Sequence, residues 1–242
     1  MMRTTLTALA LVALAGTAQA TAVVPQYTTF GDLAGATYGG SGIPTDPTAI
    51  TTGNGLTLGL TAFGRYANPA LSNDGAGTFT ATAGANDGLE PGNPHPVGAT
   101  WSFGYYVNGG TQALGRLQID LFYDLDPAAG TDLADYGHID LDAALNGGGG
   151  GGLTLFQDSQ NLAFAFLASG VPGVVFPPAS APFDANASGE YGLVLRVRDQ
   201  AGNDLGTSAI LIDVNGVPEP GSLALAGLAL LGGFAARRQR KA

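Results

Sequence analysis

A run of aspartates lies near the middle of the chain, and carboxylates are side chains that bind hard cations or transfer protons. The spacing Asp124-x-Asp126 places two carboxylates on the same side of an extended chain, and oxygen ligands gathered at a strand end can bind Ca²⁺. The sequence lacks the complete calcium-loop pattern, D-x-D-x-D-G followed by a glutamate at the twelfth position. Two interpretations therefore stay open: a calcium site, and a solvated acidic loop that keeps a sheet edge soluble. The candidate calcium ligands are Asp124, Asp126, Asp132 and Asp135.

Catalytic patterns are scarce in this sequence. It has no cysteine, which excludes a cysteine nucleophile and a thiolate metal site. The two histidines, His95 and His138, occur without H-E-x-x-H, and there is no G-x-S-x-G turn. Paired carboxylates can hydrolyse glycosides, but nothing distinguishes a general acid from a general base among 19 acidic residues. We therefore predict a non-enzymatic protein with no cofactor other than the calcium considered above, and a secreted hydrolase is the less favoured alternative.

Aromatic residues in a strand-like segment give a second candidate site. Trp101 and Tyr105 belong to the segment W-S-F-G-Y-Y-V at residues 101–107. On an open sheet face such rings can stack on a sugar, whereas alternating aromatic side chains on a strand more often belong to a core. The core interpretation is favoured. The calcium site and the sugar-stacking rings remain alternatives, so a carbohydrate- or calcium-binding surface module is the second functional hypothesis.

β-strands must position these side chains, because apolar and polar residues alternate through the regular segments. In residues 117–123, Leu117, Ile119, Leu121 and Tyr123 share one face. We expect residues 101–123 to form a hairpin around Asn108-Gly109-Gly110, and residues 31–55, rich in Gly, Pro and Thr, to form a loop. The sequence predicts an all-β fold, an antiparallel β-sandwich of about 8 to 10 strands with long Gly/Pro-rich loops.

The last part of the body has the most regular alternation. Tyr191, Leu193, Leu195 and Val197 lie at every second position, a turn follows at residues 201–204, and a second strand follows at residues 208–214. This pattern resembles the final hairpin of immunoglobulin-like and cadherin-like β-sandwiches. The resemblance implies a corner tyrosine at Tyr191.

The charge distribution excludes nucleic acid as a partner. All 19 acidic residues lie between Asp32 and Glu219, where only four arginines occur, which leaves a formal charge of −15 on that segment. Such a surface repels nucleic acid and anionic lipid and favours solubility. No lysine precedes Lys241.

Both ends of the chain are expected to be targeting segments. Residues 1–20 have the features of a cleavable signal peptide: a basic residue, a short apolar run, and an A-x-A cleavage pattern at Ala18-Gln19-Ala20. The mature chain is then expected to begin at Thr21, with a β-sandwich body at 21–216. Residues 217–242 are a separate tail that contains an extended Pro-Glu-Pro segment, an apolar run expected to form a single short transmembrane helix, and basic residues.

The tail resembles a PEP-CTERM sorting signal. The matching residues are Val217, Pro218, Glu219 and Pro220, followed by the apolar run 222–236 and then Arg237 and Arg238. The two prolines keep the segment out of helices and strands, and the basic end fixes orientation by the positive-inside rule. The apolar run, roughly 22 Å long as a helix, is short against the ~30 Å hydrocarbon core, which favours a temporary anchor.

The resemblance implies several partners and a location. The tail holds the protein transiently at the inner membrane, where an exosortase-type peptidase recognises and processes it. The body then reaches the cell surface or the extracellular matrix of a Gram-negative bacterium, in association with exopolysaccharide or biofilm.

Overall fold

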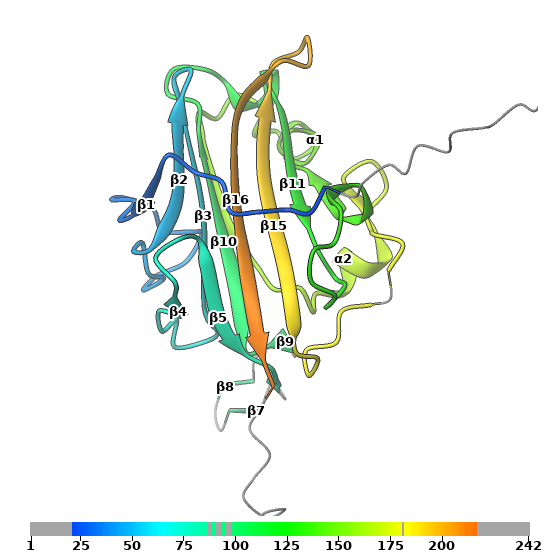
Figure 1. Cartoon of the computed structure of the whole chain (residues 1–242). Helices are drawn as coiled ribbons and strands as arrows, with labels where there is room; N and C mark the ends of the chain where they lie inside the picture. The colour runs from blue at the N-terminus through cyan, green and yellow to red at the C-terminus, as the bar shows by residue number, and fades with distance from the viewer. Residues whose placement is uncertain (1–20, 87–88, 91–92, 95–97, 181, 217–242) are drawn as a thin grey trace, which may run out of the picture.

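Two β-sheets pack face to face in the computed structural model, which describes residues 21–86, 89–90, 93–94, 98–180 and 182–216 (Figure 1). The expected signal peptide at 1–20 and the tail at 217–242 lie outside the described residues. The residues that the structure describes include no helix with the length and hydropathy of a membrane span. The architecture confirms the prediction of a mainly β fold in two sheets.

One sheet has five antiparallel strands in the order β1-β2-β3-β10-β13. Its centre is the long pairing of β3 with β10, in which Leu60 lies opposite Tyr105. The strands are β1 (Thr29–Gly31), β2 (Thr48–Gly53), β3 (Leu56–Gly64), β10 (Trp101–Asn108) and β13 (Leu155–Gln160).

The other sheet has seven strands in the order β14-β12-β11-β15-β16-β5-β4. Its longest pairing is the hairpin of β15 and β16, whose turn is closed by Asp199: the Asp199 carboxylate accepts hydrogen bonds from the amides of Ala201 and Asn203 at 2.8 and 2.9 Å. The strands are β14 (Val175–Phe176), β12 (Gly137–Asp140), β11 (Gln118–Tyr123), β15 (Gly189–Arg198), β16 (Asp204–Asn215), β5 (Thr78–Thr82) and β4 (Ser72–Asn73).

Short elements complete the described fold. Helix α1 (Leu141–Gly147) begins where the Asp140 carboxylate accepts a hydrogen bond from the amide of Ala143, an ordinary N-cap. The other elements are the helix α2 (Ala165–Ser169), the 3₁₀ turns η1 (Leu114–Arg116) and η2 (Leu133–Asp135), and two ribbons, β6 (Ala85–Asn86) with β9 (Gly98–Ala99) and β7 (Leu89–Glu90) with β8 (Asn93–Pro94).

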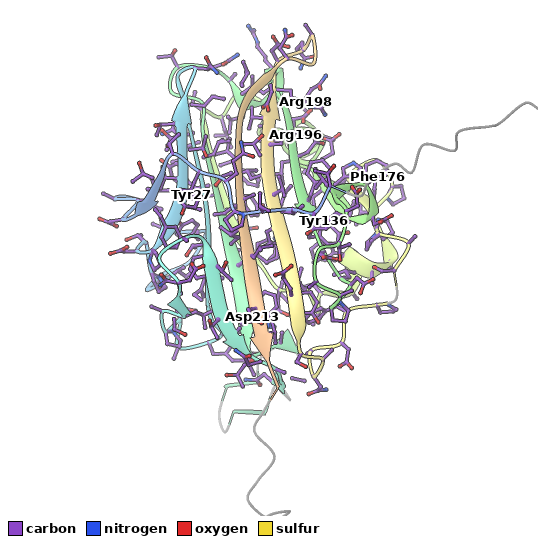
Figure 2. The ribbon with its side chains drawn as sticks, viewed as in Figure 1. Tyr27, Tyr136, Phe176, Arg196, Arg198 and Asp213 are labelled. Atoms are coloured by element: carbon purple, nitrogen blue, oxygen red, sulfur yellow. The ribbon has the colours of Figure 1, made fainter. Side chains whose placement is uncertain are left out.

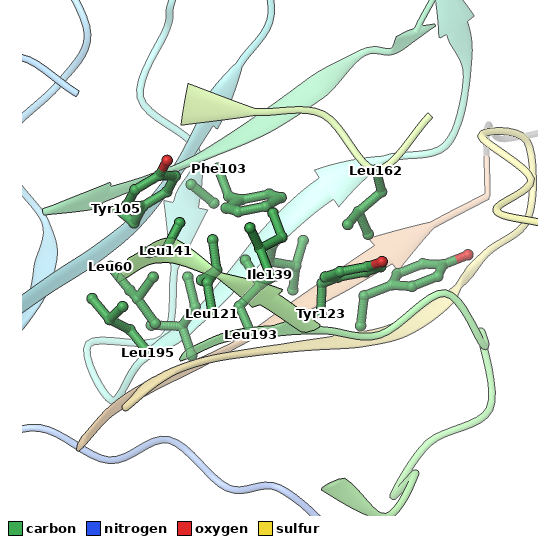
Figure 3. Close-up of a cluster of buried hydrophobic side chains, with 14 of the residues drawn as sticks. Leu60, Phe103, Tyr105, Leu121, Tyr123, Ile139, Leu141, Leu162, Leu193 and Leu195 are labelled. Carbon is green, nitrogen blue, oxygen red and sulfur yellow. The ribbon is translucent and has the colours of Figure 1, made fainter. Parts of the chain in front are cut away.

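The core lies between the two sheets, where alternate residues of each strand meet (Figure 3). Side chains from β11 and β15, among them Leu121 and Leu193, face Leu60, Phe103 and Tyr105 from the five-stranded sheet. Every residue that the alternation assigned to the inner face of 117–123 and of 191–197 is buried. The sequence therefore predicted correctly which face of these strands forms the core.

The strands differ from the prediction in four respects. The expected hairpin of residues 101–123 is wrong, because β10 and β11 belong to opposite sheets and the buried Leu114 of η1 marks the crossing between them. The sandwich is not wholly antiparallel, because β5 runs parallel to β16. Residues 31–55 are not all loop, because β2 forms at 48–53, and the five- and seven-stranded sheets exceed the expected strand number.

A loop covers the outer face of the five-stranded sheet. Residues 32–47 place Leu33 and Tyr38 against Ile50 and Tyr106, which forms a second, smaller apolar cluster. The Tyr38 ring lies so close to Gly104 that a Cβ there would be 2.7 Å from it, so β10 needs a glycine at this position. Strand β10 is thus covered on both sides, which explains why seven of its eight residues are buried.

Tyr191 lies in the penultimate strand β15, as the sandwich resemblance implies, and it is fully buried. Its hydroxyl, however, has no hydrogen-bond partner among the described residues, so the structure lacks the backbone hydrogen bond that defines a tyrosine corner. The ring instead packs against Phe183 and Trp101, at centroid distances of 5.2 and 6.0 Å.

Candidate functional site

The four candidate calcium ligands each serve a separate local role. Asp124 is only 2% exposed at the end of β11, and its Oδ1 accepts a hydrogen bond from the amide of Asp126 at 2.9 Å. The Asp126 and Asp132 carboxylates accept from the amides of Ala128 and Ala134, and Asp135 lies in η2. Across the described residues, no group of three or more acidic or histidine side chains could hold a metal ion. The geometry gives no support to the calcium hypothesis.

The pKa of Asp124 reflects its burial. Loss of hydration raises the pKa of the carboxyl to about 6, although hydrogen bonds from the Asp126 amide, Thr131 and Tyr136 oppose that shift. The pKa of Asp142 is raised in the same way: burial, together with the neighbouring Asp140, raises it to about 6. The expectation of a uniformly solvated acidic loop is therefore wrong at Asp124, because the chain after β11 folds back over this side chain.

Trp101 and Tyr105 are core residues. They are 1% and 2% exposed, and their rings lie between the two sheets, with Tyr105 against Phe156 at a centroid distance of 5.8 Å. Neither offers a free ring face, which corrects the sugar-stacking alternative at these two positions. The core interpretation holds because the loop over the outer face and the opposite sheet together enclose β10.

A row of three aromatic rings lies instead on the outer face of the seven-stranded sheet. Strand register places Phe122 of β11 beside His138 of β12, and His138 beside Phe176 of β14. The His138 and Phe176 rings are stacked at 4.5 Å, and the guanidinium of Arg196 lies 4.7 Å from the centroid of Phe122. The row thus ends in a cation on one side and in the 43%-exposed Phe176 at the sheet edge on the other.

Sequence reasoning missed this row. One signal was present: Phe122 is a large apolar side chain on the otherwise polar face of a half-buried strand, between Asp120 and Asp124. Its partners could not be found from the sequence, because His138 and Phe176 approach it only through strand register.

Arginine and aspartate side chains extend the row along the sheet. Asp120 receives a hydrogen bond from Nη2 of Arg198 at 2.8 Å, and Nη2 of Arg196 lies 3.9 Å from the same carboxylate oxygen. Figure 2 shows Arg196 and Arg198 in succession on β15, with Asp213 toward the opposite end of the adjacent β16. Two of the four arginines of the acidic segment thus lie together on this face.

The first residues of the body cross the same face as a strap, defined here as residues 21–28 and drawn in blue in front of β15 and β16 in Figure 1. Between the strap and the sheet lies an open groove of about 650 Å³. Its floor includes Phe122, Val194 and Ala209, and Arg196, Asp204 and Thr207 supply polar groups. The groove combines apolar surface with donors and acceptors, the composition of a small-ligand site.

The last strand of the body ends where the sorting signal begins. Strand β16 continues to Asn215, which pairs with Thr82 of β5, and Val214 is still buried in the core. The comparison with family models matches residues 216–241 to the PEP-CTERM protein-sorting motif. The chain carries a PEP-CTERM sorting signal. This signal marks an exported protein that is sorted by an exosortase and anchored transiently in a membrane.

The PEP-CTERM match begins directly after the last residue of β16, so the sorting signal includes no residue of the described strands. The comparisons with curated proteins and with solved structures gave no match. The two-sheet arrangement is loosely consistent with the sandwich resemblance of the final hairpin.

Proposed function

We propose that this chain is an exported, non-enzymatic protein of the cell surface or extracellular matrix of a Gram-negative bacterium, associated with exopolysaccharide or biofilm. The observation that carries the proposal is the PEP-CTERM sorting signal at residues 216–241. The acidic segment from Asp32 to Glu219, without a recognisable catalytic motif, is consistent with a structural or binding role.

The position of the signal explains how processing can spare the fold. Because β16 ends at Asn215, cleavage within residues 217–220 removes no strand residue and no buried core side chain of the described body. Pro218 and Pro220 fix φ and lack a backbone N–H, so we expect them to favour the extended form that a peptidase cleft binds. The apolar run 222–236 and the basic residues after it then hold the tail in the inner membrane, with the body outside the cytoplasm.

Replacing both prolines, Pro218→Ala with Pro220→Ala, should block processing. Without the two rings, residues 217–221 can adopt helical backbone angles, so we expect that the exosortase no longer meets an extended peptide. We expect tail-containing protein to accumulate in the membrane fraction, with roughly a tenfold or larger fall in the released or surface-located form. Fractionation and intact mass spectrometry measure this, with Gln239→Ala as the matched control in the tail. Normal processing of the double variant would contradict the proposal.

A second candidate function, binding of carbohydrate, is favoured by the groove beneath the strap. An apolar floor at Phe122 and Val194 beside the polar groups of Arg196 and Thr207 suits a ligand with both an apolar ring face and hydroxyl groups. The strongly acidic surroundings disfavour a polyanion, so the expected ligand is a neutral oligosaccharide.

Phe122→Ala should weaken such binding about tenfold, because Phe122 is the largest apolar side chain among the residues that line the groove. An array of neutral and uronate-containing oligosaccharides identifies the ligand, and calorimetry with the array hit compares the variants. Leu155→Ala, which removes a 39%-exposed side chain of the other sheet, is the matched control. Equal binding by Phe122→Ala, or no binding of any array member by the wild type, would contradict carbohydrate binding in this groove. The structural role would then be the remaining proposal.

A further inference from the structure

The strap is attached to the body at two points, the connection between β11 and β12 and the strand β16. At its start, the amide of Thr21 donates a hydrogen bond to Oδ2 of Asp132 at 2.8 Å, and Ala22 forms a bridge with Asp132. Farther along, Gln26 and Ala209 exchange two backbone hydrogen bonds of 3.0 and 2.8 Å. Between these points Val24 is 66% exposed, and residues 21–24 line the groove. The strap therefore forms one wall of the groove, and Asp132 binds the first residue of the strap.

The atom that Asp132 binds is the one that export changes chemically. The A-x-A pattern at 18–20 places signal-peptide cleavage between Ala20 and Thr21. Hydrolysis of that peptide bond consumes one water, leaves a carboxylate on Ala20, and converts the Thr21 amide nitrogen into an amine that is protonated at neutral pH. A neutral donor with one N–H thus becomes an ammonium with three, at a position 2.8 Å from a carboxylate oxygen.

We propose that Asp132 is the binding site for the α-ammonium group that signal-peptide removal creates at Thr21, and that this ion pair fixes the strap over the groove. The inference rests on the export step of the proposed function. Export then changes the contact at the start of the strap from a neutral hydrogen bond to an ion pair.

The surroundings of Asp132 favour a cation. Its Oδ1 accepts a hydrogen bond from the amide of Ala134, and together with the bond from Thr21 this keeps the pKa of the carboxyl below its ordinary range. The other charged groups near this end of the strap are Asp135 on the same 3₁₀ turn and, along the groove, Asp204 of β16 and Arg196 of β15. Acidic groups outnumber the single arginine, which in turn lies over Phe122.

The ion pair has a defined pH window. An α-amino group that gains a carboxylate partner has a raised pKa, so its contribution is complete below the ordinary value of about 7.7 to 8.0 and is lost as the pH rises through the raised value. The lowered pKa of Asp132 gives a contribution that is present above the ordinary value of about 3.9 and is lost as the pH falls through the lowered value. The ion pair therefore makes its full contribution from roughly pH 4 to pH 8.

The chain offers a clean way to test the pair. Because no lysine precedes Lys241, the α-amine of Thr21 is the sole primary amine between residues 21 and 216 of the processed protein. An amine-acylating ester then reports on this single group, and peptide mapping after cleavage at arginine separates it from Lys241 wherever the tail persists.

We expect the exported wild-type protein to begin at Thr21 and its amine to titrate above the ordinary range of about 7.7 to 8.0. Asp132→Asn should return the titration to that range and speed acylation about threefold at pH 7. Asp135→Asn, on the same turn, is the matched control and should keep the wild-type profile. Circular dichroism verifies that each variant is folded.

Two results would overturn the inference, and they are distinguishable. If the exported protein begins at Thr21 but its amine titrates identically in the wild type and in Asp132→Asn, the ion pair does not form, while the export proposal stands. If the exported protein begins at another residue, no ammonium lies beside Asp132, and the cleavage position is wrong as well.

Discussion

Trp101→Ala is expected to lower the free energy of unfolding by about 3–5 kcal/mol. The indole is 1% exposed between the sheets, where it contacts Phe183 and Tyr191. Its Nε1 has no hydrogen-bond partner among the described residues, so the substitution breaks no hydrogen bond there, and the whole effect comes from lost packing and the cavity that remains.

Urea denaturation measures this loss, with the slope against denaturant as a check that the compactness of the two states is unchanged. Leu153→Ala is the control, since Leu153 is 48% exposed and its truncation should change stability by less than about 0.5 kcal/mol. If Trp101→Ala lowers the free energy of unfolding by less than about 1 kcal/mol, this ring is not a core residue. The hypothesis that it contacts a ligand would then apply again.

The second large effect concerns pH: stability should rise as the pH is lowered from about 7.5 to about 5. Burial raises the pKa of Asp124 to about 6 and also raises that of Asp142, to about 6, and that of Asp158. Between the ordinary aspartate value of about 3.9 and the raised value, the folded state binds more protons than the unfolded state, so the free energy of unfolding falls as the pH rises. For Asp124 alone, a shift of about two units corresponds to at most about 3 kcal/mol at pH 7.

Below about pH 4 the trend should reverse. Hydrogen bonds from backbone amides lower the pKa of Asp74 and Asp132, and the Asn203 side chain, with nearby amides, lowers that of Asp199. Their stabilising contribution is present above the ordinary value and is lost as they protonate.

Thermal or urea unfolding at a series of pH values, compared with Asp124→Asn, tests this account. The variant should be more stable than the wild type at pH 7 and should show a flatter profile between pH 5 and pH 7, because the asparagine remains neutral. Asp213→Asn, at an exposed position of β16, is the matched control. A wild-type stability that increases from pH 5 to pH 7 would contradict the burial of Asp124.

Side-chain alternation predicted the faces of the strands correctly because it is a local property. Leu117 to Tyr123 and Tyr191 to Val197 are buried at every second position, as a period of two requires. The same alternation carries no information on which other strand pairs with a given strand. It therefore could not separate β10 from β11 into different sheets, nor predict the parallel pairing of β5 with β16. The edge strands β1, β4 and β14, of two or three residues each, are too short to show any period.

The candidate site was predictable only in part for the same reason. Residue types suggested Trp101 and Tyr105, but whether a ring on a strand is free depends on what covers it, and the loop 32–47 and the facing sheet are distant in sequence. The groove depends on a contact between Thr21 and Asp132, which are 111 residues apart. In contrast, the PEP-CTERM signal is a contiguous motif whose order of residues is itself the evidence, and the match at 216–241 confirms it.

The central claim is that the body is exported and its tail removed, and the intact mass of the native, surface-located or released protein tests it most directly. The account predicts a single chain that begins at Thr21 and ends within or close to Val217–Gly221, without the apolar run and Arg237–Lys241. A mature surface-located protein that retains the complete tail through Ala242 would contradict it.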